Sequence, residues 1–186
     1  MKRFFDLLLA VCVAVVLVLP FVLVALLVKL TSEGPILYWS DRVGCNNRIF
    51  RMPKFRTMLV NTPAVATHLL VNPTACLTPI GSFLRKSSLD ELPQLWSILK
   101  GDMSFVGPRP ALFNQEDLIL LRTRYGVQVL VPGLTGWAQI NGRDDLPIPE
   151  KVKLDAEYLH KHSLGFDMLI LWRTLSKILE RDGVSH

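Results

Sequence analysis

Two adjacent carboxylates, Asp90 and Glu91, lie in the part of the sequence that is best suited to chemistry. The sequence allows two helix starts here: Ser88 caps the helix with Glu91 at its third position, or Pro93 is the first helical residue. In both cases the acids lie beside free backbone N–H groups and the positive end of the helix dipole. The simplest interpretation is that they only stabilise the helix terminus, by about 0.3 to 1 kcal/mol each.

Cations surround these acids in the sequence. No Asp or Glu occurs from Arg42 to Leu89, and Gly107-Pro108-Arg109-Pro110 follows, in which two prolines stiffen the chain around one arginine. Acids that bind Mg²⁺ or attack phosphorus need nearby cations to neutralise phosphate charge, so the combination predicts phosphoryl-transfer chemistry. A basic patch that only holds anionic lipid headgroups is the alternative. The basic residues before the acids are Arg42, Arg48, Arg51, Lys54, Arg56, Arg85 and Lys86.

A later segment, Pro132 to Arg143, carries three glycines and ends in another arginine. It predicts either a loop that lets a ligand approach the backbone or a structural turn buried by Trp137. The sequence contains no GxxxxGK[ST], GxGxxG, GxSxG or HExxH motif. A P-loop NTPase, a Rossmann dehydrogenase, a hydrolase with a nucleophile elbow and a zincin therefore have no support.

Composition places these residues in a chain with one unusual segment. The chain has 186 residues, of which 50% are hydrophobic and 20% are charged, a balance that excludes an intrinsically disordered protein. Its three cysteines form no CxxC pair, so neither a disulfide framework nor a zinc site is indicated. No nucleic acid is expected as a partner.

The unusual segment is the N-terminus, where no charge occurs from Leu7 to Val28. A helix of this length measures about 33 Å, enough to cross the hydrocarbon core of a bilayer. Pro20 favours a break within it, and basic residues flank both ends, which favours a re-entrant helix-break-helix; a straight spanning helix remains the alternative. Both arrangements predict a membrane segment at residues 1–29 and one cytosolic domain at residues 30–186.

The cytosolic part predicts a mainly helical α+β domain with short strands. The predicted loops are Gly101–Pro110 and Pro132–Pro147, and Pro63–Pro79 is not assigned. We expect strands at Ile36–Tyr38 and Arg48–Phe55 around a turn at Gly44–Asn47, and helices at Leu92–Leu99, Gln115–Tyr125, Pro149–Lys161 and Phe166–Glu180.

The last of these helices carries an apolar stripe. Core packing is the default expectation for such a stripe. A place in the membrane interface, with Trp172 among the headgroups, is the alternative. The stripe consists of Phe166, Leu169, Ile170, Leu175, Ile178 and Leu179.

Six strings, in order along nearly the whole chain, resemble the bacterial sugar transferase family, and within it the small monotopic phosphoglycosyl transferases. Larger members add membrane helices before this region. The strings are Lys54-Phe55-Arg56-Thr57-Met58, Gly81-Ser82-Phe83-Leu84-Arg85-Lys86, Leu89-Asp90-Glu91-Leu92-Pro93-Gln94-Leu95, Lys100-Gly101-Asp102-Met103-Ser104, Val106-Gly107-Pro108-Arg109-Pro110 and Pro132 to Arg143.

The resemblance implies transfer of a sugar 1-phosphate from a UDP-sugar to undecaprenyl phosphate, with release of UMP, as the first membrane step of bacterial glycoconjugate assembly. It implies that Asp90 is a nucleophile that forms a covalent phosphosugar intermediate and binds Mg²⁺. Glu91 would help to position the metal and deprotonate the lipid phosphate. The implied location is the cytosolic face of the bacterial inner membrane.

The resemblance also implies further site residues. Lys54, Arg56, Arg85, Arg109 and Arg143 would hold phosphates or nucleotide, and Asp167 matches another polar position of the family. The family breaks its re-entrant helix at a Ser-Pro pair, whereas this chain has Leu19-Pro20. Two other functions remain as alternatives: a membrane-anchored adaptor that binds anionic lipid, and a polyprenyl-phosphate phosphatase with an aspartyl-phosphate intermediate.

Overall fold

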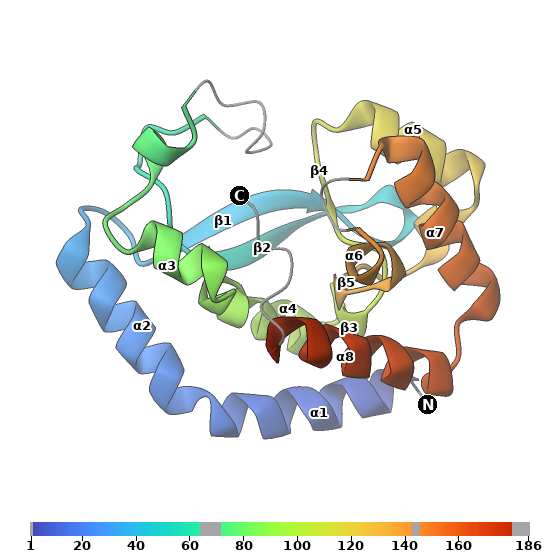
Figure 1. The fold of residues 1–186 in the computed structure, drawn as a ribbon, viewed down its shortest axis with the longest axis horizontal. Helices are drawn as coiled ribbons and strands as arrows, with labels where there is room; N and C mark the ends of the chain where they lie inside the picture. Colours follow the sequence, from blue (N-terminus) through green and yellow to red (C-terminus); the bar gives the residue numbers. More distant parts are fainter. Residues whose placement is uncertain (1, 64–71, 143–145, 180–186) are drawn as a thin grey trace.

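An antiparallel hairpin runs through the middle of the molecule (Figure 1). In the computed structural model, which describes residues 2–63, 72–142 and 146–179, β1 (Leu37–Val43) pairs with β2 (Ile49–Phe55). The turn between them is the 3₁₀ helix η1 (Cys45–Asn47), in which Asn46 and Asn47 adopt positive φ angles of 54° and 59°. Both predicted strands and their turn are confirmed, and β1 runs five residues beyond its predicted end at Tyr38.

A second sheet joins two segments that the sequence predicted as loops. β3 (Ser104–Val106) pairs in parallel with β5 (Gly133–Thr135), and the backbone N–H of Gly107 donates to Thr135 O at 2.9 Å. A Cβ atom at Gly107 would collide with the carbonyl of Val131, so the close approach requires glycine there. β4 (Ala111–Leu112) extends the first sheet in the order β2-β1-β4.

The predicted helices are confirmed with small differences in their ends. α5 (Glu116–Arg124), α7 (Ile148–Lys161) and α8 (Leu164–Leu179) follow the predicted ranges within two residues. Sequence analysis did not predict α3 (Gly81–Lys86), the four-residue α6 (Trp137–Ile140) or the short 3₁₀ helices η3 (Thr74–Cys76) and η5 (Val127–Val129).

The helix of the acidic pair begins earlier than Leu92. It starts as the 3₁₀ helix η4 (Leu89–Gln94) and continues without interruption as α4 (Leu95–Lys100). The predicted capping box is wrong, because Ser88 has a φ of 56° and its side chain makes no cap hydrogen bond. The helix does begin directly after Ser88, as one of the two predicted starts had it. The alternative start at Pro93 is wrong, since Pro93 lies inside η4.

The N-terminal segment forms two helices, α1 (Lys2–Val16) and α2 (Val18–Thr31), which we call the bent pair. Their axes differ by 63°, and among the described residues no single helix has the length and apolar character to cross a membrane, whereas the two together do. The break falls at Leu17, three residues before Pro20. A proline ring conflicts with the carbonyl four residues earlier, here that of Val16, which explains a break at this place.

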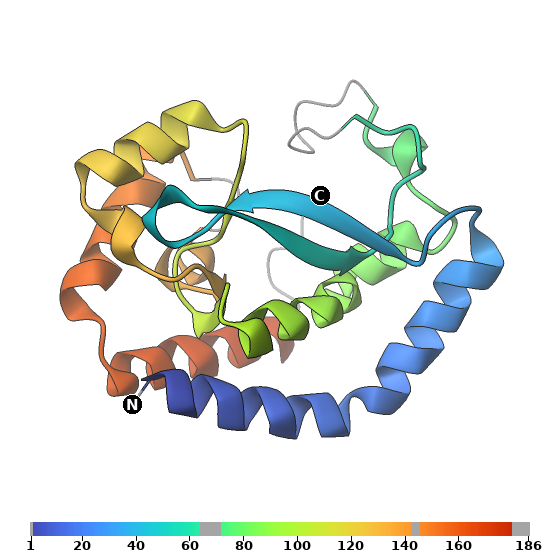
Figure 2. The same ribbon diagram turned by 180° about the vertical axis from the view of Figure 1, so that it is seen from behind.

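The bent pair lies along the outside of the molecule and connects to its core (Figure 2). Ala10 of α1, Ile98 of α4 and Ile170 of α8 are fully buried in one apolar cluster. Other apolar side chains of the same helices remain exposed, including Val16 (74%) and Trp172 (69%). Leu169 and Leu175 of α8 are exposed as well, so core packing of the whole α8 stripe is wrong.

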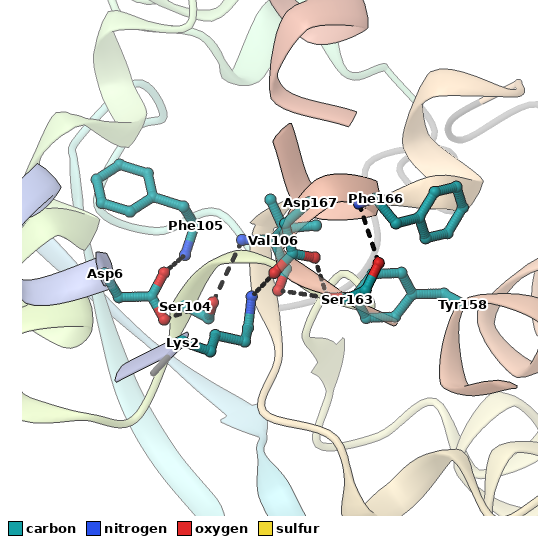
Figure 3. A network of polar contacts seen from close by, with 9 residues as sticks. All are labelled: Lys2, Asp6, Ser104, Phe105, Val106, Tyr158, Ser163, Phe166 and Asp167. Atoms are coloured by element: carbon teal, nitrogen blue, oxygen red, sulfur yellow. Dashed lines mark hydrogen bonds and ion pairs between the residues drawn. The ribbon is translucent and has the colours of Figure 1, made fainter. Parts of the chain in front are cut away.

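Polar contacts fix the first turns of α1 to the rest of the protein (Figure 3). Lys2 Nζ donates to Asp167 Oδ2 at 2.5 Å, and the Tyr158 hydroxyl donates to Asp167 Oδ1 at 2.6 Å. The carboxylate of Asp6 accepts hydrogen bonds from Ser104 Oγ at 2.9 Å and from the backbone N–H of Phe105 at 3.2 Å. Both acids are buried, and these bonds replace the water that each carboxylate has lost.

Candidate active site

The acid pair, Asp90 and Glu91, lies where η4 packs against the end of β2. Lys54 Nζ donates to Glu91 Oε1 at 2.7 Å, and the side chains of these two residues are only 16% and 14% exposed. A pair this far from solvent is held more firmly than an exposed ion pair, because water screens it less. The structure therefore brings together three of the residues that the sequence singled out.

Arg109 joins the same carboxylate from the opposite loop. Its Nη2 donates to Glu91 Oε1 at 3.2 Å, so one oxygen accepts from two cations. The loop around Arg109 is fixed through its backbone: Arg122 Nη1 donates to Arg109 O at 2.8 Å, and Arg42 Nη1 donates to Pro110 O at 3.2 Å. The loop that carries the Arg109 guanidinium is thus restrained both by its prolines and by the hydrogen bonds to its carbonyls.

A buried ion pair beneath this loop was missed by sequence analysis. Arg122 donates through Nε and Nη2 to Asp155 Oδ2 at 2.9 and 2.7 Å, and Asp155 is 1% exposed. Burial raises the pKa of Asp155, and the adjacent guanidinium opposes that rise. A signal was present, since Asp155 shares the apolar face of α7 with Val152 and Ala156, where a lone acid requires a partner.

The carboxyl group of Asp90 is buried among charges of both signs. The residue is 7% exposed, and its pKa is raised chiefly by burial and further by the neighbouring Glu91. The positive charges of Lys54, Arg85 and Arg109 act in the opposite direction. A carboxylate that water solvates poorly is a stronger nucleophile than a hydrated one, and the cations keep its ionised form accessible.

The cations around Asp90 are themselves perturbed. The pKa of Lys54 is lowered, first by burial and then by the charge of Arg109, while Glu91 and Asp90 act to raise it. The pKa of Arg85 is lowered by burial, and its Nε donates to Thr57 Oγ1 at 3.0 Å. Desolvated cations of this kind gain from an anionic ligand that replaces the lost water.

The other predicted site residues lie elsewhere or are not described. Arg56 donates through Nη2 to Ser32 O at 3.1 Å and Ser32 Oγ at 2.8 Å, at the end of the bent pair. Asp167 belongs to the network with Lys2 and Tyr158. Arg143 lies outside the described residues.

The acid pair fits the way proteins hold Mg²⁺. No group of three or more His, Cys, Asp or Glu side chains that could bind a metal ion occurs within residues 2–63, 72–142 and 146–179. Mg²⁺ is commonly held by one or two carboxylates together with oxygens of a bound phosphate, so Asp90 and Glu91 are the side chains that would hold it here. A divalent cation would also favour the ionised form of Asp90 against the effect of burial.

Taken together, this geometry suits a phosphorylated ligand. Lys54, Arg85 and Arg109 offer three cations next to two carboxylates, of which that of Asp90 is buried. The arrangement can neutralise a diphosphate, hold a divalent cation and form a bond to phosphorus.

Known proteins resemble this chain over nearly its whole length. The family model for bacterial sugar transferases matches residues 1–181. The undecaprenyl-phosphate galactose phosphotransferase of Salmonella typhimurium is 36% identical over 200 residues, which cover 98% of this chain and 41% of the relative. The exopolysaccharide production protein ExoY of Sinorhizobium fredii is 38% identical over 198 residues, which cover 95% of this chain and 84% of the relative.

A third relative has a UDP-sugar in its name. The UDP-N-acetylgalactosamine-undecaprenyl-phosphate N-acetylgalactosaminephosphotransferase of Aeromonas hydrophila is 38% identical over 191 residues, covering 98% of this chain and 44% of the relative. The chain thus spans less than half the length of two of these three proteins. The family model covers nearly all of its residues, and so the chain belongs to the bacterial sugar transferase family.

Proposed function

We propose that this protein transfers a sugar 1-phosphate from a UDP-sugar to undecaprenyl phosphate and releases UMP. The observation that carries the proposal is the cluster of Lys54, Arg85 and Arg109 around the acid pair Asp90 and Glu91. The named relatives support the lipid carrier, since two of the three described above are undecaprenyl-phosphate sugar phosphotransferases by name.

Asp90 is the nucleophile in this proposal. Its carboxylate oxygen forms a bond to the phosphorus nearer the sugar, and the bond from that phosphorus to the bridging oxygen breaks, so that UMP leaves with the electron pair. An oxygen of undecaprenyl phosphate then attacks the same phosphorus, and the bond to Asp90 breaks and restores the carboxylate. The burial of Asp90 supports this role, because a poorly hydrated carboxylate loses little solvation on attack.

The remaining residues of the cluster bind and position the substrates. Lys54, Arg85 and Arg109 neutralise the diphosphate, and Glu91 holds Lys54 and Arg109 in place through one oxygen. Mg²⁺ bound by Asp90, with help from Glu91, would supply further stabilisation of charge on the phosphate oxygens. Glu91 would also take the proton of the incoming lipid phosphate.

The bent pair supplies the membrane location in this proposal. Its first residue, Lys2, contacts Asp167, and Ser32, the residue directly after it, contacts Arg56, so both ends lie against the same domain. That arrangement supports a re-entrant element rather than a span, with residues 30–186 on the cytosolic face of the inner membrane. Exposed apolar side chains on α1, α2 and α8 provide the surface that would enter lipid.

Nucleotide release tests the proposal directly. The full chain in detergent is incubated with a panel of UDP-sugars, Mg²⁺ and undecaprenyl phosphate, and UMP, UDP and inorganic phosphate are resolved. We expect UMP from at least one sugar, and a loss of more than about 10³-fold in Asp90→Asn. Release of UDP would indicate an ordinary glycosyltransferase, and release of phosphate a phosphatase. Full activity in Asp90→Asn would overturn the role of Asp90.

A further inference from the structure

The start of the bent pair holds the end of the helix that carries the acid pair. Arg3 donates through Nη1 to Ile98 O at 2.5 Å and through Nη2 to Leu99 O at 2.8 Å. These are carbonyls of the last turn of α4, where Ile98 O also accepts from the backbone N–H of the cap residue Gly101 at 3.2 Å. A guanidinium at a helix C-terminus also faces the negative end of the dipole.

At the other end of the bent pair the donor belongs to the domain, and the acceptor lies directly after α2. Arg56, which is 5% exposed, donates from the domain to the carbonyl and hydroxyl oxygens of Ser32, just beyond α2. The chain reaches this guanidinium at Gly34, where φ is +103° and a Cβ atom would collide with Arg56 Nη1. Only glycine combines that backbone conformation with that approach.

Both contacts lie next to the candidate active site along the chain. α4 continues η4 without a break. Arg3 therefore contacts the C-terminal end of the same continuous helical segment that carries Asp90 and Glu91. Arg56 follows Lys54 by two residues at the end of β2. The ion pair of Lys54 and Glu91 therefore joins two elements, each of which is tied to one end of the bent pair.

We propose that Arg3 and Arg56 are positioning residues through which the bent pair sets the geometry of the candidate active site. This inference rests on the proposed function for its consequence in turnover, but not for the geometry itself. Loss of the hydrogen bonds made by Arg3 or by Arg56 moves η4 relative to β2 and disturbs the contact between Lys54 and Glu91. The bent pair then determines the geometry of the candidate active site as well as its location at the membrane.

Two variants and two matched controls distinguish this positioning role from the general effect of losing a cation or adding a methyl group. Arg3→Met removes the tie to α4, and Gly34→Ala displaces Arg56 from the end of α2 without changing Arg56 itself. Lys100→Met removes another cation from the last turn of α4, one whose side chain is 59% exposed and pairs with Asp102. Gly165→Ala adds a methyl group where no atom lies within 4 Å.

The first measurement does not depend on activity. The rate at which an amine-acylating reagent modifies Lys54 in the full chain is followed by mass spectrometry at one fixed pH. In the wild type we expect slow modification, because the Lys54 side chain is 16% exposed and its Nζ donates to Glu91 Oε1 at 2.7 Å. We expect faster modification in Arg3→Met and Gly34→Ala, and the wild-type rate in both controls.

The second measurement is the burst of UMP released in the absence of undecaprenyl phosphate, so that delivery of the lipid plays no part. In the proposed mechanism Asp90 then stays bonded to the phosphosugar, and each enzyme molecule releases one UMP. We expect the rate constant of this single turnover to fall about 10-fold or more in Arg3→Met and Gly34→Ala, with the donor concentration for half-maximal rate changed much less, and Arg3→Lys to recover part of the loss. A wild-type burst rate and an unchanged rate of Lys54 modification in both variants would overturn the inference. A wild type that releases no UMP would refute the proposed function, while the rate of Lys54 modification would still decide the inference.

Discussion

Lys54 Nζ and Arg109 Nη2 share one oxygen, Glu91 Oε1, at 2.7 and 3.2 Å. The two cations come from different parts of the chain, β2 and the loop after β3. Two positive charges this close repel each other, and the negative charge of the shared carboxylate offsets that repulsion. The same arrangement concentrates positive charge beside Asp90 without neutralising Asp90 itself.

Replacement of Glu91 is therefore expected to disturb both cations. In Glu91→Gln the favourable charge on Lys54 is lost, and the pKa of Lys54 falls further because Arg109 still acts to lower it. We expect turnover to fall by about 10²-fold, with the protein still folded. UMP release measures the loss, and Glu116→Gln, at an exposed acid of α5, is the control that should retain activity. Equal activities in the two variants would contradict a role for Glu91.

The elements around this cluster could be predicted because their signals are local. Periodic apolar residues predicted α5, α7 and α8, and alternation around an asparagine turn predicted β1 and β2. The length of the N-terminal apolar segment and the position of Pro20 predicted a broken helix, and the break occurs within three residues of that proline. The capping signal at Ser88 failed, since the left-handed conformation of that residue prevents its side chain from capping.

The contacts that build the site could not be predicted, because they join residues far apart in the sequence. Lys54 and Glu91 are separated by 37 positions, and Arg3 and Ile98 by 95. β3 and β5 each contain three residues, too few for an alternating pattern to stand out from a loop. The resemblance singled out candidate site residues, whereas the partners that hold them, such as Arg122 for the Arg109 loop, required the structure.

The buried carboxyl of Asp90 should limit stability at neutral and alkaline pH. Its pKa is raised by burial, so ionisation costs the folded protein more than the unfolded chain. That cost is absent below the ordinary pKa of 3.8 and complete above the raised value in the folded protein. We therefore expect Asp90→Asn to melt at a higher temperature than the wild type at alkaline pH.

The sign of this effect can be checked by following the melting temperature against pH. The difference between Asp90→Asn and the wild type should shrink as the pH falls through the raised pKa and vanish below 3.8. Asp41→Asn, at an exposed acid of β1, is expected to show no such advantage. A variant less stable than the wild type at alkaline pH would show that Asp90 is stabilised in its ionised form.

Lys54 should set the alkaline limit of activity. In the proposed function, Lys54 binds phosphate in its ammonium form. Burial together with Arg109 lowers the pKa of Lys54 below 10.5, so turnover should fall before an ordinary lysine would deprotonate. Lys54→Arg keeps the charge at all accessible pH values, and we expect its alkaline limb to move to higher pH even where its maximal rate is lower. A limb that stays in place in Lys54→Arg would assign the titration to another group.

The ion pair between Arg122 and Asp155 should stabilise the folded protein and also fix the conformation of the Arg109 loop. Asp155→Ala leaves a guanidinium buried without its carboxylate, and we expect the free energy of unfolding to fall by about 3 to 5 kcal/mol. The double variant Arg122→Met with Asp155→Leu removes both charges and should recover most of that loss, as measured by thermal and denaturant unfolding. It still lacks the hydrogen bond from Arg122 to Arg109 O, so turnover should stay low although stability returns. Recovery of both together would mean that the Arg109 loop keeps its shape without Arg122.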